Sequence, residues 1–469
     1  MNEKGTIVKR GMALSALMLA LVLAGCASPP AIDASALPAA PAAFKEGDGR
    51  WTRAAPAEAQ PRGEWWKAFS DPLLDDLVER AGRNNASIQV AAARLQQARA
   101  LVRATNADRS PQVGVGAGVV RERDIRTGNR PQTVISAGAD LSYEVDLFGR
   151  LAAATDAATL DAQSREALLQ STRLLVQASV AQTYLALRAV DAERALVRET
   201  VLAYRDTLRL TERRYQAGDV AELDVARVNT EVAATESEAL ALDRTRAELE
   251  HALAVLLGEA ASSFQIAPAE WSTALPVIPA GVPSTVLVRR PDVSAAQRSM
   301  LAAQKRVGIA EAAWFPDLAL TASGGYASPE LSDLFKWSAR NWGIGALLSL
   351  PIFDGGRRKA GVESATAELD AALASYREQV LVAFREVEDQ LSGLRLLAEQ
   401  AEAQSRAVNS ASRATLLSDA RYRNGYVSQL DLLDARRSEL RNRRQALQVR
   451  SAQYQSTVAL VRALGGDWQ

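Results

Sequence analysis

The sequence contains almost no cysteine or histidine. This scarcity excludes most kinds of metal site and most kinds of nucleophilic active site. The 469 residues contain one cysteine and one histidine, which excludes an intramolecular disulfide and any cluster of His and Cys ligands. A Ser-His-Asp or Cys-His site would have to use His251, and no serine lies in a G-x-S-x-G motif. We interpret His251 as a residue on a helix face, and the sequence indicates a protein that is not an enzyme and has no metal site.

Aromatic residues and excess charge are also scarce. Lys and Arg together number 55, as do Asp and Glu, and this balance argues against a nucleic-acid-binding protein, which would be basic. Only 5% of the residues are aromatic, whereas 48% are hydrophobic, with alanine the largest contributor. That composition favours closely packed helices over one thick globular core. The length leaves room for up to about three domains.

The N-terminus has the pattern of a bacterial secretion signal. Basic residues (Lys4, Lys9 and Arg10) precede an apolar run over residues 12–23, which is too short for a comfortable transmembrane helix. The run ends in Leu-Ala-Gly-Cys26, which resembles the bacterial lipobox. We therefore expect residues 1–25 to be a signal peptide and Cys26 to carry a covalent lipid, with no other cofactor. A free cysteine after an ordinary signal peptide is the alternative.

The residues after Cys26 indicate the membrane to which the protein is sorted and an extended tether. Ala27 and Ser28 follow it, without the aspartate associated with retention in the inner membrane, so the outer membrane and its lipid are favoured. Residues 26–62 are rich in Ala and Pro, a composition typical of an extended arm. The predicted lipidated tether spans this segment.

The rest of the chain repeats itself at an offset near 207 residues. Three pairs of equivalent positions show the offset: Gly149 with Gly356, Gly218 with Gly425, and Gly258 with Gly465. A match over most of the chain predicts two structural repeats. We place the first repeat at residues 63–262, a Pro-rich bridge at 263–291, and the second repeat at 292–469.

Each repeat contains two segments in which apolar and small or polar residues alternate. These predicted strands lie near residues 112–121, 133–145, 317–326 and 341–352. Their length suits a tilted strand in a membrane, and Trp314, Tyr143, Tyr326 and Trp342 lie near the strand ends, where interfacial aromatics belong. The alternative is a soluble sheet with one face exposed to solvent. The adjoining helices, however, are too long to fold back and cover the apolar face of such a sheet.

Four strands cannot close a barrel in lipid, where an open sheet edge is not viable. Two copies would give eight strands and little lumen, and three copies would give twelve strands and room for a pore. The strand pattern therefore favours a homotrimer.

Two long helices are predicted at residues 150–216 and about 357–423, since both segments lack proline and carry apolar residues at helical spacing. At 1.5 Å per residue each would be on the order of 100 Å long. Gly218 and Gly425 follow them as C-terminal caps would, and return helices then run to Leu257 and Leu464. Helices of this length suit a tube that crosses a compartment.

Several stretches resemble the outer membrane factor family, the TolC-like and OprM-like exit ducts of tripartite efflux pumps. They are Trp65 to Pro72, Arg289 to Asp292, Ala313 to Pro316, Tyr422 to Gly425, Leu430 to Ala435 and Ala463 to Trp468. The resemblance implies a mostly α fold in which a periplasmic α-barrel of long helices continues into a twelve-stranded β-barrel, formed by a homotrimer with four strands per chain. It also implies a periplasmic adaptor (membrane fusion) protein and an inner-membrane transporter of the RND type as partners.

The same resemblance implies a closing iris at the periplasmic helix turns. The resemblance places this gate at Tyr422, Asp431, Asp434, Tyr215 and Asp224, and we assign the turns at Gly218 and Gly425 to adaptor docking. Val427 stands where some TolC-like members carry an arginine, so we expect apolar gate contacts from Leu430 and Leu433 instead. Carboxylates repeated by three-fold symmetry in a throat would favour cations, resist closure, and provide a place for a divalent ion. The alternative is that they are ordinary acids in the first turn of a helix.

Two functions from different classes remain open on the sequence. The favoured one is a passive outer-membrane exit duct for small molecules, which opens when the adaptor engages. The other is a structural periplasmic spacer or adhesin lipoprotein without channel activity, for which four matched amphipathic strands would have no use. The exported substrate is not specified by the sequence.

Overall fold

The computed structural model describes residues 41, 43–46, 63–123, 131–276, 278 and 289–466. The predicted signal peptide and Cys26 lie outside the described residues, as does most of the predicted tether. The chain forms two compact units, and each combines segments of both predicted repeats. One, the strand unit, contains Ala93–Glu166 and Ala295–Glu378, and the other, the helical unit, contains Ala39–Ala92, Ala167–Ser294 and Gln379–Gln469.

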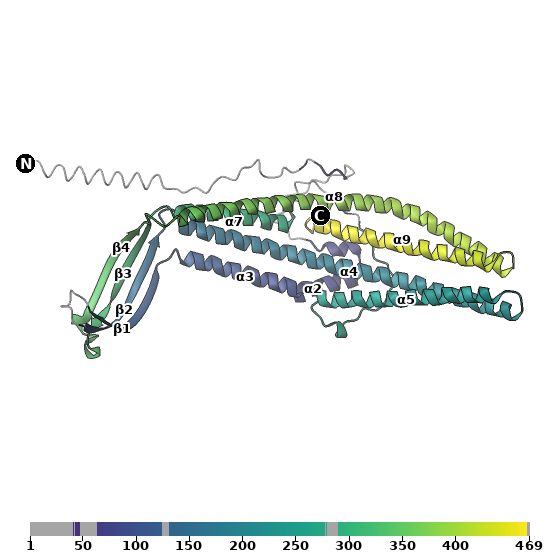
Figure 1. The fold of residues 1–469 in the computed structure, drawn as a ribbon, viewed down its shortest axis with the longest axis horizontal. Coiled ribbons are helices and arrows are strands. Elements are labelled where there is room, and N and C mark those ends of the chain that lie inside the picture. Colours follow the sequence, from purple (N-terminus) through teal and green to yellow (C-terminus); the bar gives the residue numbers. More distant parts are fainter. Residues whose placement is uncertain are drawn as a thin grey trace, which may run out of the picture. The chain divides into compact units, whose positions relative to one another are not determined.

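Figure 1 shows long helices and one small sheet. The elements, in chain order, are η2 (Trp65–Phe69), α2 (Pro72–Asn84), α3 (Ala86–Ala107), β1 (Gln112–Arg123), β2 (Pro131–Val145), α4 (Arg150–Gln216), α5 (Glu222–Leu256), η4 (Ala261–Ser263), α7 (Pro291–Ala312), β3 (Asp317–Ser328), η5 (Leu331–Asp333), η6 (Trp337–Ala339), β4 (Arg340–Ser349), α8 (Arg357–Arg423) and α9 (Gln429–Ala463). Among the described residues, no helix combines the length and the apolar composition that crossing a membrane requires.

The sheet of the strand unit is antiparallel, with its four strands in the order β1-β2-β3-β4 (Figure 1). Val115 lies opposite Ala139, and Ala322 lies opposite both Leu141 and Ile344, so the apolar residues of every strand share one face. Within the described residues, the outer edges of β1 and β4 have no partner strand. Both edges are therefore available to other strands.

Glycines bring the strands close together on the opposite, small and polar face. Gly138 of β2 lies opposite Gly116 of β1 and Gly325 of β3. A Cβ atom at Gly325 would lie 2.5 Å from the carbonyl oxygen of Ala137 and 2.6 Å from the Cα of Gly138. Since no side chain fits at that distance, a residue other than glycine at position 325 would force β2 and β3 apart.

Helices of the strand unit pack on each other through small hydroxyls and surface ion pairs. The Ser164 hydroxyl of α4 donates to the carbonyl oxygen of Ala295 in α7 at 3.0 Å. Lys305 of α7 pairs with Asp156 of α4 at 2.9 Å. Near the strand ends, the rings of Phe148 and Phe315 stack with centroids 4.7 Å apart.

The last strand, β4, ends at Ser349 instead of the expected residue 352, because Pro351 has no N–H group to donate to the hydrogen bonds of the sheet.

The helical unit is built from two hairpins that correspond to each other in the repeat. Helices α4 and α8 have 67 residues each, and their return helices α5 and α9 have 35 each. The end of the first return helix closely contacts the end of α2, and the end of the second closely contacts the last residues of the predicted bridge. A Cβ at Gly258 would lie 2.6 Å from the Asn84 carbonyl oxygen, and one at Gly465 would lie 2.9 Å from that of Arg289. Glycine is required at both contacts, which explains this part of the repeated sequence pattern.

A short piece of the N-terminal segment is fixed to α8 within the helical unit. The Phe44 ring is buried and lies edge-on to Phe384, with centroids 6.5 Å apart. The Glu388 carboxylate accepts hydrogen bonds from the backbone amides of Lys45 at 2.7 Å and Glu46 at 2.9 Å. We call Phe44 to Glu46 together with Phe384 and Glu388 the arm clasp.

Candidate functional site at the helix turns

The two turns that end the long helices have the same backbone structure. Gly218 and Gly425 have φ angles of 81° and 76°, the left-handed region that favours glycine. The amide of Gly218 donates to Tyr215 at 3.0 Å, and the amide of Gly425 donates to Tyr422 at 3.0 Å. The next amide closes a wider loop in each turn, from Asp219 to Arg214 and from Tyr426 to Arg421, at 2.8 Å in both. Each turn is therefore a Schellman cap.

The turns differ at the start of the return helix. Helix α9 begins with a capping box, in which the Ser428 hydroxyl accepts from the Asp431 amide and the Asp431 carboxylate accepts from the Ser428 amide. Helix α5 has Ala221 at the corresponding position and no side-chain cap. Asp224, the counterpart of Asp431, instead lies 3.7 Å from Arg227. Of the two predicted gate acids in these positions, Asp431 is therefore held more firmly by its neighbours in the chain.

The exposed carboxylates of the second turn are Asp431 and Asp434. Hydrogen bonds from the hydroxyl and amide of Ser428 hold the pKa of the Asp431 carboxyl below its usual range. The Asp434 carboxylate lies 3.5 Å from the guanidinium of Arg437, and its side chain is exposed. Asp431 is therefore charged at neutral pH, and it serves as a helix cap whether or not it also acts at a gate.

The corresponding tyrosines of the two turns have different surroundings. Tyr422 is only 3% exposed, and its hydroxyl shares a hydrogen bond of 3.4 Å with the Thr211 hydroxyl of α4. The Arg214 guanidinium lies over the Tyr422 ring, 4.8 Å from its centroid. Tyr215, in contrast, is exposed. Tyr422 therefore joins the second turn to α4, whereas the Tyr215 ring remains accessible.

The two predicted gate leucines also differ in their burial. Leu433 is 1% exposed and packs in a cluster with Tyr204, Val228 and Val232, which joins α4, α5 and α9. Leu430 is exposed. Leu433 thus stabilises the packing inside the protomer, and Leu430 is the leucine whose side chain is available to a neighbour.

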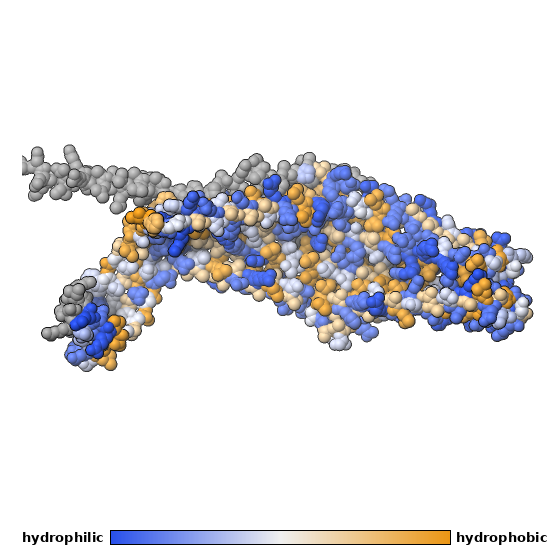
Figure 2. Space-filling model, in the orientation of Figure 1, coloured by the Kyte–Doolittle hydropathy of each residue, from blue (hydrophilic) through white to orange (hydrophobic). Residues whose placement is uncertain are grey.

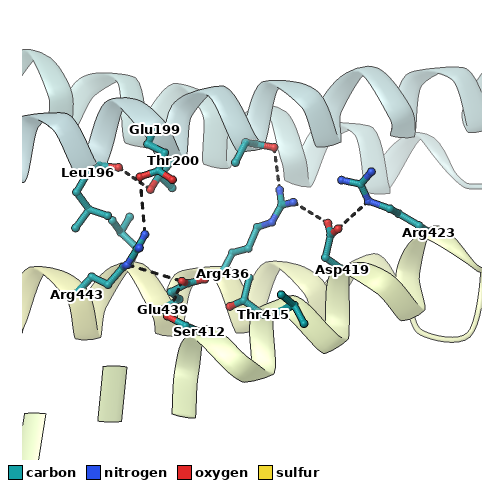
Figure 3. A pocket seen from close by; sticks show the side chains of 13 residues that line it. Leu196, Glu199, Thr200, Ser412, Thr415, Asp419, Arg423, Arg436, Glu439 and Arg443 are labelled. Atoms are coloured by element: carbon teal, nitrogen blue, oxygen red, sulfur yellow. Dashed lines mark hydrogen bonds and ion pairs between the residues drawn. The ribbon is translucent and has the colours of Figure 1, made fainter. Parts of the chain in front are cut away.

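Arg436 forms the central polar contact between the two hairpins (Figure 3). Its guanidinium donates to the Ala203 carbonyl oxygen of α4 at 2.8 Å. It also donates to the Thr207 hydroxyl of α4. It also donates to Asp419 of α8 at 2.9 Å, and Arg423 donates to the same carboxylate at 2.7 Å. A cleft of about 450 Å³ between α4, α8 and α9 is lined by Ala203, Asp419, Arg423 and Arg436 among others.

The second return helix is joined to the first by a further set of contacts. Arg437 donates to Glu231 of α5 at 2.9 Å, and Arg444 donates to Glu238 of α5 at 3.0 Å. The amide of the Gln429 side chain donates to the Asp224 carbonyl oxygen at 3.2 Å, which brings the two predicted turns together. These polar contacts, with those of Arg436, are referred to below as the hairpin links.

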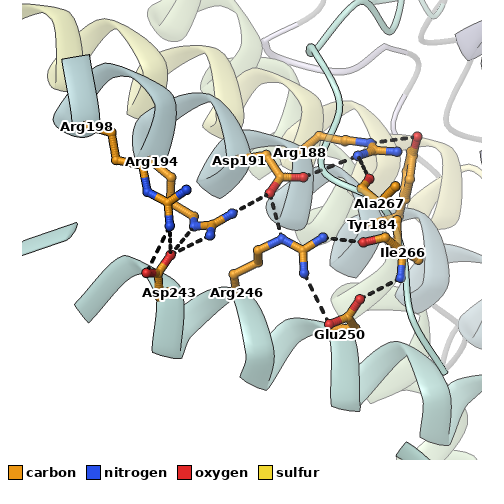
Figure 4. Close-up of polar contacts among 10 residues, drawn as sticks. All are labelled: Tyr184, Arg188, Asp191, Arg194, Arg198, Asp243, Arg246, Glu250, Ile266 and Ala267. Carbon is orange, nitrogen blue, oxygen red and sulfur yellow. Dashed lines mark hydrogen bonds and ion pairs between the residues drawn. The ribbon is translucent and has the colours of Figure 1, made fainter. Parts of the chain in front are cut away.

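A buried charge network lies farther along α4 in the same unit (Figure 4). The Asp191 side chain is 2% exposed and has three arginines within hydrogen-bonding distance: Arg246 at 2.8 Å, Arg188 at 3.2 Å and Arg194 at 3.3 Å. Arg188 also donates to the Ala267 carbonyl oxygen at 3.0 Å. The network therefore joins α4, α5 and the predicted bridge.

The same network continues to the start of the first repeat through Tyr184. Its hydroxyl donates to Asp71 at 2.8 Å and accepts from Arg188 at 3.0 Å. Burial raises the pKa of Tyr184 to about 12, so the hydroxyl stays protonated and remains a donor. The other oxygen of Asp71 caps α2 by accepting from the amides of Leu73 and Leu74. The Asp71 carboxylate thus caps the start of α2 and also binds the charge network through Tyr184.

The family model described as outer membrane efflux protein matches residues 77–259 and 282–466. The chain belongs to the outer membrane efflux protein family.

Relatives in this family match along nearly the whole chain. Outer membrane protein OprJ of Pseudomonas aeruginosa is 35% identical, over 98% of this chain and 97% of OprJ. The antibiotic efflux pump outer membrane protein ArpC of Pseudomonas putida is 33% identical, over 97% of this chain and 95% of ArpC. The solved structure of the outer-membrane channel OprN superposes with a TM-score of 0.85 at 30% identity, covering 94% of this chain and all of that chain.

Membership in the outer membrane efflux protein family confirms the resemblance found in the sequence, the fold class and the outer-membrane location. The protein is an outer-membrane efflux channel, and the spacer or adhesin alternative is not favoured. The predicted roles of the turn residues stay predictions. In the described part of the chain, no group of His, Cys, Asp and Glu side chains is arranged to hold a metal ion.

The most connected side chains of this efflux protein were not among the predicted site residues. Arg436 and Asp191 were missed because charged residues on a long helix are usually solvated, and their partners lie on other helices. One signal was available for Arg436: it follows the predicted gate acid Asp434 by two residues, next to Arg437. The sequence alone gives no means of separating these arginines from the many exposed ones.

Proposed function

We propose that the protein is the passive exit duct of a tripartite efflux pump, closed at rest at the helix turns and opened by a periplasmic adaptor that engages them. An inner-membrane transporter of the RND type supplies the cargo, and the duct carries out no bond chemistry and needs no cofactor. The cargo class is small molecules, which the antibiotic efflux named for ArpC supports. The observation that carries the proposal is the set of hairpin links beside the capped turn of Asp431.

The proposed assembly is a homotrimer. The strand unit has an apolar face on all four strands and two open edges, β1 and β4, and an open edge is costly in lipid. Pairing β4 of one copy with β1 of the next satisfies both edges. Three copies then give twelve strands, enough to leave a lumen, whereas two copies leave little room.

The anchor and the tether complete the proposed arrangement. A lipid on Cys26 would hold the N-terminus at the inner face of the outer membrane, and several acyl chains at about 0.8 kcal/mol per buried CH₂ would make that attachment stable. The arm clasp holds Phe44 and Lys45 against α8.

In the proposed gating step, the α8/α9 hairpin moves relative to the α4/α5 hairpin. The contacts that oppose this movement are the hairpin links, above all Arg436 of α9, which bonds to Ala203 and Thr207 of α4. Charged Asp431 residues from three copies would repel one another in a narrow throat and favour opening. The resting state is then a balance between repulsion at the throat and polar contacts within each protomer.

Conductance in planar bilayers tests this proposal through Arg436. We expect purified wild-type protein to give small currents, and Arg436→Ala to give larger or more frequent openings because its contacts to Ala203 and Thr207 of α4 are lost. Arg441→Ala is the matched control, since Arg441 is an exposed arginine of α9 with no ion pair among the described residues. Equal currents in all three proteins would place the closing contacts elsewhere, and no current from trimeric, inserted protein would contradict the duct.

A further inference from the structure

The connection between β3 and β4, residues 329–339, is an ordered loop with large apolar side chains on its surface. It contains two 3-10 turns, η5 and η6, closed by hydrogen bonds from the amide of Leu334 to Leu331 at 3.3 Å and from the amide of Ala339 to Lys336 at 3.0 Å. Leu331, Phe335 and Trp337 are 69%, 73% and 80% exposed. An apolar surface of this kind is unusual for a loop in water and indicates a partner.

The contacts of the two aromatic residues show on which side of the sheet the loop folds. Phe335 lies edge-on to Tyr326, with ring centroids 5.5 Å apart, and the Arg340 side chain lies over the Trp337 ring. Tyr326 and Arg340 are paired across β3 and β4, so their side chains share one face. The loop therefore attaches to that face through both aromatic rings.

That face is the apolar one. Trp342 and Ile344 follow Arg340 at every second residue of β4, and both are exposed, as are the valines of β1 at positions 113, 115 and 119. The opposite face presents Asp140, Ser323 and other small or polar residues. In an outer-membrane channel the apolar face meets lipid and the polar face meets the lumen. The loop thus extends the lipid-facing surface and does not fold over the lumen.

We propose that the β3–β4 loop is a membrane anchor, which inserts Leu331, Phe335 and Trp337 at the boundary between headgroups and acyl chains of the outer leaflet. Aromatic rings are favoured at that boundary. Arg340 lies beside the Trp337 ring, where a cationic group meets lipid phosphates. Figure 2 shows hydrophobic and hydrophilic residues side by side at the end of the sheet away from the helices. The proposal rests on the outer-membrane location of the family and not on the gate.

Fluorescence quenching tests the depth of the loop. In a Cys26→Ser background, an environment-sensitive label is attached to Phe335→Cys and, as the matched control, to Asn341→Cys, which lies on the polar face at the same level. The proteins are reconstituted in phosphatidylcholine vesicles with bromine on the upper acyl carbons. We expect several-fold stronger quenching by the brominated lipid at 335 than at 341, and stronger quenching by aqueous iodide at 341. Equal lipid quenching at both positions, or iodide quenching at 335, would overturn the proposal.

A second variant removes the rings instead of labelling them. Phe335→Ser combined with Trp337→Ser should leave single-channel conductance unchanged, because the loop does not cover the lumen. The same variant should leave vesicles more readily in a mild-detergent extraction series than wild type. A rise in conductance would show that the loop covers the lumen, and unchanged extraction would show that it is no anchor. Absence of current from the wild-type protein in the same vesicles would instead count against the proposed duct.

Discussion

Ser428 and Asp431 hold each other at the start of α9: the Asp431 carboxylate accepts from the Ser428 amide at 3.0 Å and from its hydroxyl at 2.7 Å. The predicted gate acid is thus also a helix cap. Because these bonds favour the charged carboxylate, they lower the pKa of Asp431. Their contribution to the stability of the folded protein is complete above the ordinary pKa of an Asp carboxyl, and it is lost as the pH falls through the lowered pKa.

A pH titration of ion preference follows from this cap. If Asp431 lines the throat, wild-type channels should keep their cation preference below about pH 4, the ordinary range of an Asp carboxyl. Ser428→Ala removes the hydroxyl bond and raises the pKa of Asp431, so its cation preference should disappear at a higher pH than in wild type. Reversal potentials in a salt gradient measure this. Identical titrations in the two proteins would show that Asp431 does not set the ion preference.

The glycine turns can be tested by alanine. Gly425→Ala places a Cβ at a φ of 76°, which we expect to destabilise the protein by about 1–2 kcal/mol. Gly361→Ala is the control, because Gly361 lies inside α8 with ordinary helical φ and nothing near its Cβ position, and there alanine should stabilise the helix by up to about 1 kcal/mol. Thermal unfolding followed by circular dichroism measures both. A stabilising Gly425→Ala would contradict the turn structure.

The buried network around Asp191 predicts a large loss of stability. Asp191→Ala leaves three guanidinium groups without their shared carboxylate, and breaking a buried ion pair costs about 3–5 kcal/mol. Asp156→Ala is the matched surface control, since its pair with Lys305 is exposed and worth about 1 kcal/mol or less. Denaturant unfolding of both proteins gives the comparison, and similar midpoints for the two variants would refute the structural role of the network.

The arm clasp predicts a local effect without a global one. Glu388→Ala removes the acceptor for the amides of Lys45 and Glu46, so hydrogen exchange at these two amides should become faster, whereas exchange in α4 should not change. Glu402→Ala, at an exposed position of the same helix, should alter neither. Unchanged exchange at residues 45 and 46 in Glu388→Ala would show that Glu388 does not hold the arm.

The sequence predicts the parts of the fold that local chemistry determines. The bounds of α4 and α8 follow from composition and helical spacing, and the turns follow from Gly218 and Gly425, whose φ angles only glycine adopts readily. The alternation of Trp342 and Ile344 with glycine likewise identifies β4 and its apolar face. Each of these features depends on neighbours in the chain.

The contacts between hairpins are not predictable in this way. Leu433 and Leu430 have the same residue type and lie three residues apart, yet one is buried and the other exposed. Asp431 and Asp224 occupy equivalent repeat positions, and only Asp431 has a serine to form a capping box. Such differences depend on which helices pack together, as do the partners of Arg436, and only the folded chain defines them.

Single-channel recording of the Asp431→Ala/Asp434→Ala double variant beside wild type tests the central claim most directly. A duct closed at the second turn should give small, cation-preferring currents in wild type, and the cation preference should be lost in the variant, since both carboxylates are exposed there. Large currents that are identical in size and ion preference in the two proteins would contradict a gate at this turn.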